Sequence, residues 1–555
     1  MFEIGKDIYR FGGRVAKHRD TERVRLNVVY SVIGVLFVLF IAKTLYYGVL
    51  GTNRSGKADV AGNWEITRAD IEDRNGVKLA KNVISTKIQL VSKRVENPDA
   101  VALLVHEIFP YKYSVNQVLD WIRRGKYVVL KEHATDAEIA AFQDALRAAK
   151  REARQQKKSE HKLIGLETVS EQVRRYPKHN LFAHAVGFVG KEGVGLDGAE
   201  RIFDSYLREN TDPLRLSLDA RIQEQFHTRL TEAMNTYHAK AATGMLMNAR
   251  TGEMLAMVSL PDYDPERVSA YPVANRIFKP MRDVLEMGSV FKIFNTAIAY
   301  ENNIGGRYYV AKPYILRTKS GRYVHTFHDS QKMKQDFMTV DEVMVHSCNV
   351  GSVQIAEKFP DGAQAEFFHR LHLDEKLDLE FGKTEKSIFP KKWRITDIAS
   401  ASFGHTVAVT PMHLFLGVNA VTNGGIYINP TIKKRDVGRI IGERVLDEKI
   451  SAKLRANMVR VVEETSGKLA RINGIKIGGK TGTAEKRDNA GMSDRRRNVT
   501  TFVGIFPADA PQYIIMVNLD EPQGVAESGG WRTASQNSVP TVGKILDGIL
   551  PLLFE

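Results

Sequence analysis

The chain has 555 residues, enough for two or three domains, and its 43% apolar and 26% charged residues are typical of a globular protein rather than a disordered one. Its formal net charge of +15 indicates an acidic surface or polymer nearby. The single cysteine, Cys348, excludes an intrachain disulfide and any zinc site built from two to four cysteines.

The first 50 residues combine a basic arm with an apolar run. Residues 1–25 contain seven lysines and arginines against four acidic residues, and residues 26–42 carry no charge. Because the apolar character resumes after Lys43, residues 26–50 are predicted to be a single transmembrane anchor, with the arm in the cytoplasm and the remaining chain outside it. The alternatives are a cleaved signal peptide, for which no small-x-small site follows the run, and a buried core helix.

Residues 51–212 are predicted to form an α+β domain. Its expected features are a polar linker, a hairpin turn and two strands, at 51–66, Asn75-Gly76, 86–91 and 127–130. Thr135 and Glu138 form a capping box for a helix that continues into a basic segment, residues 147–162. This segment is interpreted as a solvated helix face, with anionic lipid or an acidic partner as the alternative. Nucleic acid is not indicated, because interleaved aromatic residues are lacking.

A second domain is predicted from residue 213 to residue 555. Its expected helices lie at 219–230 and 539–553, and its expected strands lie within 243–258 and at 475–484, 500–506 and 513–519. With two strands early, three late and helices between, one antiparallel sheet assembled from both ends of the domain is expected. Four histidines without companion ligands at zinc spacing are interpreted as structural: His179, His184, His369 and His372.

Three short motifs in this domain carry chemistry. In the first, Ser289 and Lys292 are three residues apart, which places them on one face of a helix. A buried lysine shifts toward its neutral form, and a neutral lysine can take the proton of a serine hydroxyl and activate it as a nucleophile. Gly288 just before the serine allows a close backbone approach and a turn into the helix.

The second and third motifs supply partners for this pair. Ser347 and Asn349 form a Ser-x-Asn in a predicted helical region, where the serine can relay a proton toward Lys292 and the asparagine can hydrogen-bond a substrate amide and the lysine. The third motif, on a predicted edge strand, offers a cation, two hydroxyls and a glycine that admits a ligand backbone: Lys480, Thr481, Gly482 and Thr483. We also hypothesise that Lys480 lowers the pKa of Lys292, because two nearby ammonium groups repel each other.

The ordered set Ser-x-x-Lys, Ser-x-Asn, Lys-Thr-Gly is the signature of penicillin-recognising serine enzymes. Over nearly its whole length the chain resembles a class B penicillin-binding protein, specifically the FtsI-type division transpeptidase. Further matching segments are 68–76, 195–200, Phe403-Gly404, Thr410-Pro411 and 423–425. Too little sequence precedes Pro213 for the glycosyltransferase domain of a class A enzyme. The chain departs from the family pattern at Met287, where proline is usual, at Ala69, where glycine is usual, and at His413, where glutamine is common.

The resemblance implies a mixed α/β fold in three parts: the anchor, an elongated α+β pedestal of the dimerisation type at 51–212, and a transpeptidase domain of serine β-lactamase-like fold at 213–555. It implies that Ser289 attacks the penultimate D-alanyl carbonyl of a peptidoglycan stem, with Lys292 as the general base and Ser347 passing protons. Backbone N–H groups of Ser289 and Thr483 would form the oxyanion hole. The remaining motif residues, Asn349, Lys480, Thr481, Gly482 and Thr483, would bind substrate. No metal or cofactor is implied.

The implied partners are stem peptides on lipid-linked glycan strands, β-lactams bound covalently, the SEDS glycosyltransferase FtsW and other divisome proteins. The implied location is the bacterial inner membrane at the division septum, with the catalytic domain in the periplasm. An elongation transpeptidase is the nearest rival function, although its second motif is often Ser-x-Asp, whereas this chain has Asn349. A β-lactamase, a β-lactam sensor and a divisome scaffold without essential turnover are more distant possibilities. The loop at 487–498 is expected to flank the cleft, either steering anionic substrate or simply solvated.

Overall fold

The computed structural model describes residues 68–155, 165–190, 192–436, 438, 440–487 and 493–554, together with 30, 31, 33–35, 37 and 38. The chain divides into two compact units, residues 1–65 and 66–555. Among the described residues, no helix combines the length and the apolar character needed to cross a membrane. Most of the anchor predicted at 26–50 lies outside the described residues, so the anchor stays a prediction.

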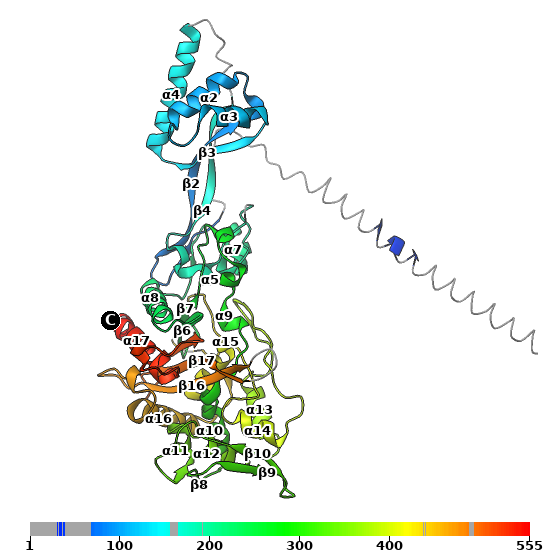
Figure 1. Cartoon of the computed structure of the whole chain (residues 1–555), viewed down its shortest axis with the longest axis vertical. Helices are drawn as coiled ribbons and strands as arrows, with labels where there is room; N and C mark the ends of the chain where they lie inside the picture. Colours follow the sequence, from blue (N-terminus) through cyan, green and yellow to red (C-terminus); the bar gives the residue numbers. More distant parts are fainter. Residues whose placement is uncertain are drawn as a thin grey trace, which may run out of the picture. The chain divides into compact units, whose positions relative to one another are not determined.

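A five-stranded sheet runs through the N-terminal part of the second unit (Figure 1). Its strands are β1 (Ile71–Glu72), β2 (Lys78–Val91), β3 (Tyr127–Ala134), β4 (Leu166–Arg175) and β5 (Leu214–Arg215). The long strand β2 pairs with β1 at its start, with β3 near its end and with β4 along most of its length. The strands predicted at 86–91 and 127–130 are therefore confirmed, and Gly76, at φ +87°, makes the predicted turn between β1 and β2.

Three helices pack against the β3 end of this sheet, namely α2 (Pro98–Ile108), α3 (Val115–Arg123) and α4 (Asp136–Gln155). Leu90, Leu130 and Phe142 are buried together in their shared core. The predicted capping box is confirmed at the start of α4: the backbone N–H of Thr135 donates to Glu138 Oε2 at 2.9 Å, and that of Glu138 donates back to Thr135 Oγ1 at 3.3 Å. Helix α4 enters the predicted basic segment and is described up to Gln155.

A buried ionic cluster joins the segments at the other end of β4. Arg68 and Arg174 direct their Nε atoms at the fully buried carboxylate of Glu200, at 2.6 and 2.7 Å, and Arg68 also binds Asp204 at 2.6 Å. Glu200 lies on the short helix α6 (Gly198–Ile202). Because a buried charge is costly unless it is paired, this carboxylate requires its two arginines and holds three chain segments together.

The second large sheet is antiparallel, with the strand order β16-β17-β18-β6-β7 (Figure 1). Its strands are β6 (Ala241–Asn248), β7 (Met254–Leu260), β16 (Gly478–Arg487), β17 (Ser493–Phe506) and β18 (Tyr513–Asp520). The predicted sheet of two early and three late strands is confirmed. The loop predicted at 487–498 is wrong in its bounds, because Arg487 ends β16 and residues 493–498 already belong to β17, where they pair with β16. The strand with the Lys-Thr-Gly motif, β16, lies at one edge, as predicted.

Helices cover both faces of this sheet. One face packs against α8 (Ala220–Thr236) and α17 (Ser538–Leu553), and the other against α10 (Lys292–Glu301), α15 (Pro411–Thr422) and α16 (Glu448–Glu464). Along β18, Ile514 and Met516 belong to the core on the α10 side, whereas Ile515 and Val517 belong to the core on the α8 side. Successive side chains of a strand point to opposite faces, so a sheet covered on both faces needs apolar residues without alternation.

The core on the α10 side continues toward the first sheet, because the same apolar cluster contains Ile71 and Leu214. The segments between the sheets form shorter elements. The helices are α5 (Ala183–Val186), α7 (Asp204–Glu209), α9 (Lys279–Arg282), α11 (Val340–Val345), α12 (Asn349–Ala356), α13 (Ala363–Arg370) and α14 (Ile395–Ala401). Four small two-stranded sheets join β8 (Arg307–Tyr309) to β11 (Phe337–Thr339), β9 (Tyr314–Arg317) to β10 (Tyr323–Phe327), β12 (Asp378–Leu379) to β13 (Gly382–Lys383), and β14 (Ile426–Tyr427) to β15 (Glu443–Arg444).

Candidate active site

The first motif lies at the entrance to α10. Ser289 sits in a 3-10 turn, η8 (Gly288–Phe291), and Lys292 is the first residue of the following α-helix. Lys292 is completely buried, and its Nζ donates to Ser289 Oγ at 2.7 Å and to Asn349 Oδ1 at 2.7 Å. The predicted contact between the serine and the lysine is confirmed, although a 3-10 turn rather than an α-helix brings them together.

Glycines allow the nucleophile turn to be packed between two other backbones. A Cβ on Gly404 would lie 2.1 Å from the carbonyl oxygen of Gly288, and a Cβ on Gly288 would lie 2.6 Å from that of Thr483. Gly482 meets the carbonyl oxygen of Met287 in the same way, at 2.4 Å. The close approach predicted at Gly482 is therefore made by the chain's own nucleophile segment. Met287, the departure from the family pattern, is buried in the apolar core.

The second motif differs from its predicted helical setting. Ser347 lies in the turn between α11 and α12, with a φ of +59°, a region that a residue with a side chain seldom adopts. Its Oγ accepts a hydrogen bond from Lys480 Nζ at 3.0 Å. Asn349 is the first residue of α12, and its Nδ2 donates to the backbone oxygen of His328 at 3.3 Å. The turn thus brings the second motif into contact with both buried lysines.

The third motif lies along the edge strand β16. Lys480 is fully buried, and its ammonium donates to the carbonyl oxygen of Thr481 at 3.2 Å and to Ser347 Oγ at 3.0 Å. The Thr481 hydroxyl bonds to Ser466 Oγ at 2.8 Å, and Thr483 Oγ1 accepts the backbone N–H of Ala534 at 3.1 Å. All the predicted site residues therefore meet at one place.

Burial dominates the electrostatics of the two lysines. It lowers the pKa of Lys292 to about 8, while the nearby Cys348 and Asp329 act in the opposite direction. Burial also lowers the pKa of Lys480 well below its usual range, and the charge of Lys292 lowers it further. The repulsion between the two ammonium groups that we hypothesised from sequence thus lowers the pKa of Lys480, whereas the pKa of Lys292 is lowered by desolvation.

Several residues at the site were missed by sequence reasoning. Asp329 accepts hydrogen bonds from the start of α12, and no spacing in the sequence connects it with the Ser-x-Asn motif. The ring of Phe403 lies 5.7 Å from Lys292 Nζ, and the adjacent His405 has a pKa lowered mainly by burial. Glu286 accepts the backbone N–H of Thr406 at 3.1 Å. Of these residues, Phe403 lay in a segment noted for its family resemblance, and Glu286 lies three residues before Ser289 in the stretch of the first motif.

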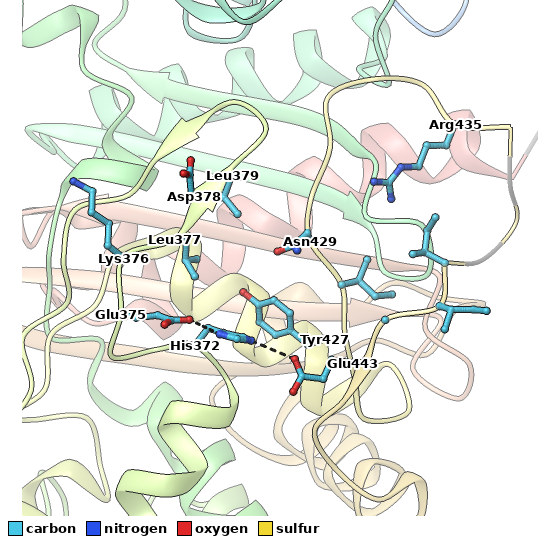
Figure 2. Close-up of a pocket in the computed structure, with 14 residues that line it drawn as sticks. His372, Glu375, Lys376, Leu377, Asp378, Leu379, Tyr427, Asn429, Arg435 and Glu443 are labelled. Atoms are coloured by element: carbon cyan, nitrogen blue, oxygen red, sulfur yellow. Dashed lines mark hydrogen bonds and ion pairs between the residues drawn. The ribbon is translucent and has the colours of Figure 1, made fainter.

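A pocket of about 570 Å³ lies away from these residues, and none of the predicted site residues lines it. Figure 2 shows His372 in its wall between Glu375 and Glu443, with the ring of Tyr427 beside it. His372 therefore has partners within the fold, as does His184, whose Nε2 bonds to a backbone oxygen at 2.8 Å. In the described part of the chain, no group of three histidine, cysteine or acidic residues is arranged to hold a metal ion.

The family model described as the penicillin binding protein transpeptidase domain matches residues 242–546, and the penicillin-binding protein dimerisation domain matches residues 65–221. The chain belongs to the penicillin-binding protein transpeptidase family. Ser289 and the two later motifs all lie within the matched transpeptidase domain.

Curated relatives of this family align over much of the chain. A probable peptidoglycan D,D-transpeptidase FtsI from Caulobacter vibrioides is 30% identical, covering 97% of this chain and 90% of the relative. A probable peptidoglycan D,D-transpeptidase PenA from Neisseria meningitidis is 28% identical over 96% and 93%, and FtsI of Escherichia coli is 29% identical over 70% and 69%. A crystal structure of a peptidoglycan synthetase from Bifidobacterium adolescentis shares the fold, with a TM-score of 0.61, 17% identity, and coverage of 88% of this chain and 96% of that one.

Proposed function

We infer that this chain is a peptidoglycan D,D-transpeptidase that works through an acyl-enzyme on Ser289. The observation that carries this inference is the 2.7 Å contact between Ser289 Oγ and the Nζ of the fully buried Lys292. A serine needs a base within hydrogen-bond reach to become a nucleophile, and a lysine can be that base only in its neutral form. With a pKa of about 8, about one Lys292 in ten is neutral at pH 7.

Acylation then proceeds with Lys292 as the general base. Ser289 Oγ passes its proton to Lys292 Nζ and attacks the carbonyl carbon of the penultimate D-alanine. The oxyanion is held by the backbone N–H groups of Ser289 and Thr483, whose segments are packed together through Gly288. Removing one such donor typically costs about 3 kcal/mol of barrier. The peptide C–N bond breaks, and the terminal D-alanine leaves with a proton that returns through Lys292 and Ser347.

Deacylation forms the cross-link. The amine of a second stem peptide attacks the ester carbonyl and gives up its proton to Lys292. The Ser289 Oγ–C bond breaks as the new peptide bond forms, and Lys292 returns the proton to Ser289 Oγ. Water in place of the amine would instead give carboxypeptidase hydrolysis. Each step needs one proton acceptor near Ser289 Oγ, and Lys292 occupies that position in both directions.

The terminal carboxylate of the substrate is proposed to bind at the edge of β16. Thr481 and Thr483 present hydroxyls there, whereas Lys480 is fully buried and donates to Ser347 Oγ at 3.0 Å. We therefore assign the first contacts of the carboxylate to the two threonines, with the charge of Lys480 behind them. An anion arriving there favours the protonated form of Lys480, which raises its lowered pKa. Because Gly482 lies against the carbonyl group of Met287, we assign it to the packing of the nucleophile turn rather than to a direct substrate contact. Asn349 is proposed to bind the substrate amide.

The test is covalent labelling by a fluorescent penicillin, which reports acylation without requiring the natural substrate. The full chain should be labelled, and Ser289→Ala should not be labelled. Ser320→Ala, an exposed serine in the turn between β9 and β10, is the matched control and should label like the wild type. Lys480→Ala should acylate markedly more slowly. Labelling that persists in Ser289→Ala would disprove the assignment of the nucleophile.

We propose further that the enzyme acts at the division septum from a single membrane anchor at 26–50, with its catalytic domain in the periplasm of a bacterial cell. The FtsI names of relatives that align over most of the chain support this role, as does Asn349 in the second motif. The proposed partners are FtsW and other divisome proteins. Depletion should give filamentous cells, whereas rounded cells would indicate an elongation role. A strain carrying only Ser289→Ala that divides normally would indicate a scaffold or sensor instead.

A further inference from the structure

A carboxylate from a distant part of the chain anchors the start of the helix that carries Asn349. Asp329, just beyond the end of β10, accepts the backbone N–H of Asn349 through Oδ1, and the same oxygen lies 3.4 Å from the N–H of Val350. Its other oxygen, Oδ2, accepts the thiol of Cys348 at 3.2 Å. The first N–H groups of a helix lack partners within the helix, so a carboxylate here both satisfies them and matches the positive end of the helix.

The residue before Asp329 determines how the Asn349 side chain is oriented. The carbonyl oxygen of His328 accepts Asn349 Nδ2 at 3.3 Å. An asparagine side chain has one oxygen and one nitrogen, so engaging the nitrogen with His328 directs the oxygen the other way. That oxygen accepts the hydrogen bond from Lys292 Nζ at 2.7 Å. The segment at residues 328 and 329 thus holds Asn349 by its backbone and by its side chain.

The same contacts hold a strained turn. Ser347 adopts a φ of +59°, a conformation that is strained for a residue with a side chain and persists only when its surroundings impose it. The next two residues, Cys348 and Asn349, are the ones bound by Asp329. Releasing them would allow the turn to relax and move Ser347 Oγ away from Lys480 Nζ.

We propose that Asp329 is a positioning residue of the acyl-transfer site, which clamps the turn at 347–349 so that Asn349 stays on Lys292 and Ser347 stays on Lys480. The inference rests on the proposed function, because it assigns Asp329 a role in the reaction of Ser289. Asp329 acts through these residues and need not touch the substrate. Its contact with the only cysteine of the chain makes the clamp measurable independently of catalysis.

The clamp also has an electrostatic signature. The titratable groups that face Lys292 are Asp329, Cys348, Lys480 and His405. Among them, Asp329 favours the ammonium form of Lys292 and so opposes the effect of burial. Replacing the carboxylate by an amide keeps one oxygen for the N–H groups of α12 but removes the charge. The pKa of Lys292 should then fall, and acylation should begin at lower pH.

The experiment compares Asp329→Ala and Asp329→Asn with the wild-type full chain. Asp336→Asn is the control, because Asp336 lies in the same loop and its carboxylate has no partner among the described residues. The acylation rate by a fluorescent penicillin is measured against pH, and the reactivity of Cys348 is followed with a thiol reagent. The thiol is fully buried, and burial raises its pKa to about 12, so the wild type should react slowly.

Asp329→Ala should lower the plateau acylation rate about tenfold or more, since a displacement of about 1 Å can cost a hundredfold, and it should expose Cys348 to the reagent. Asp329→Asn should keep the plateau within about threefold and shift the acid limb of the profile to lower pH, because it removes a charge that favours the ammonium form of Lys292. Asp336→Asn should match the wild type in both measurements.

The proposal would be overturned if Asp329→Ala reached the wild-type plateau rate of acylation, or if the acid limb of the pH profile of Asp329→Asn did not move. If Asp329→Ala does not fold, the profile of Asp329→Asn decides the question. A wild-type chain that is not acylated at all would contradict the proposed function instead. In that case the reactivity of Cys348 would still show whether Asp329 holds the turn.

Discussion

The glycine at 404 offers a sharp test of how the nucleophile turn is positioned. Gly404 has a φ of +81°, and a Cβ added there would lie 2.1 Å from the carbonyl oxygen of Gly288 and 2.8 Å from its nitrogen. Gly288 directly precedes Ser289, and on its other side it already lies against the backbone of Thr483. The new Cβ of Gly404→Ala therefore clashes with the backbone of Gly288, which cannot move away freely because Thr483 packs against its other side.

The size of the effect follows from these distances. The Cβ contact must lengthen from 2.1 Å to between 3.0 and 3.4 Å, so the backbone around Gly288 has to move by about 0.9 to 1.3 Å. A displacement of about 1 Å at a reacting group can lower a rate by about a hundredfold. The left-handed backbone adds about 1 kcal/mol of destabilisation for a residue with a Cβ. We expect acylation by penicillin to slow about a hundredfold and the free energy of unfolding to fall by about 2 to 4 kcal/mol.

Gly321→Ala is the matched control. Gly321 has the same φ of +81°, in the turn between β9 and β10, but a Cβ there would meet no atom within 4 Å. It should share the backbone cost of about 1 kcal/mol and leave acylation unchanged. Stopped-flow acylation and thermal unfolding of both variants separate the clash from the backbone effect. A folded Gly404→Ala that acylates at the wild-type rate would refute the reasoning.

Arg68→Ala removes one partner of the fully buried Glu200 and should lower the free energy of unfolding by about 3 to 5 kcal/mol, measured by thermal unfolding. As the control, Arg94→Ala breaks an exposed ion pair with Glu167 and should cost under about 1 kcal/mol. Similar losses in the two variants would contradict this prediction. Acylation should rise with pH and level off above about 8, because the neutral form of Lys292 is the base, and a flat profile from pH 6.5 to 9 would exclude that role. Thr406→Gly should stabilise the fold by about 0.5 to 1 kcal/mol, because Thr406 has a φ of +70°, which glycine adopts without strain. The backbone N–H at position 406 can still donate to Glu286 in the variant. A lower melting temperature would argue against backbone strain at this position.

The second large sheet and the contact between Ser289 and Lys292 were predictable from the sequence because both depend on local patterns. The predicted strands at 500–506 and 513–519 are apolar runs of strand length, whereas the segment at 475–484 is rich in glycine and threonine. The structure pairs β16, β17 and β18 next to one another in the expected sheet. The spacing of Ser289 and Lys292 places them within one turn of chain whether that turn is 3-10 or α-helical, so their contact did not depend on the type of helix.

Other features depended on contacts between distant segments and were not predictable. Ser347 was expected within a helix, yet it lies in a strained turn, because Asp329 and Lys480 bind the residues around it from other elements. The direction of the pKa coupling between the lysines was likewise hidden, since burial depends on how completely α10 and β16 are covered.

The sequence by itself determined the family of this protein, the order of its motifs and the sheet that carries the last of them. Motifs and strand patterns consist of residues that are close together in the sequence, so they can be recognised without the tertiary structure. Only the tertiary structure decided how closely the parts meet. The spaces at Gly288, Gly404 and Gly482 are filled by backbones from distant segments, and the clamp at Asp329 reaches across 20 residues to Asn349. Such approaches depend on the packing of whole elements, which no local pattern records.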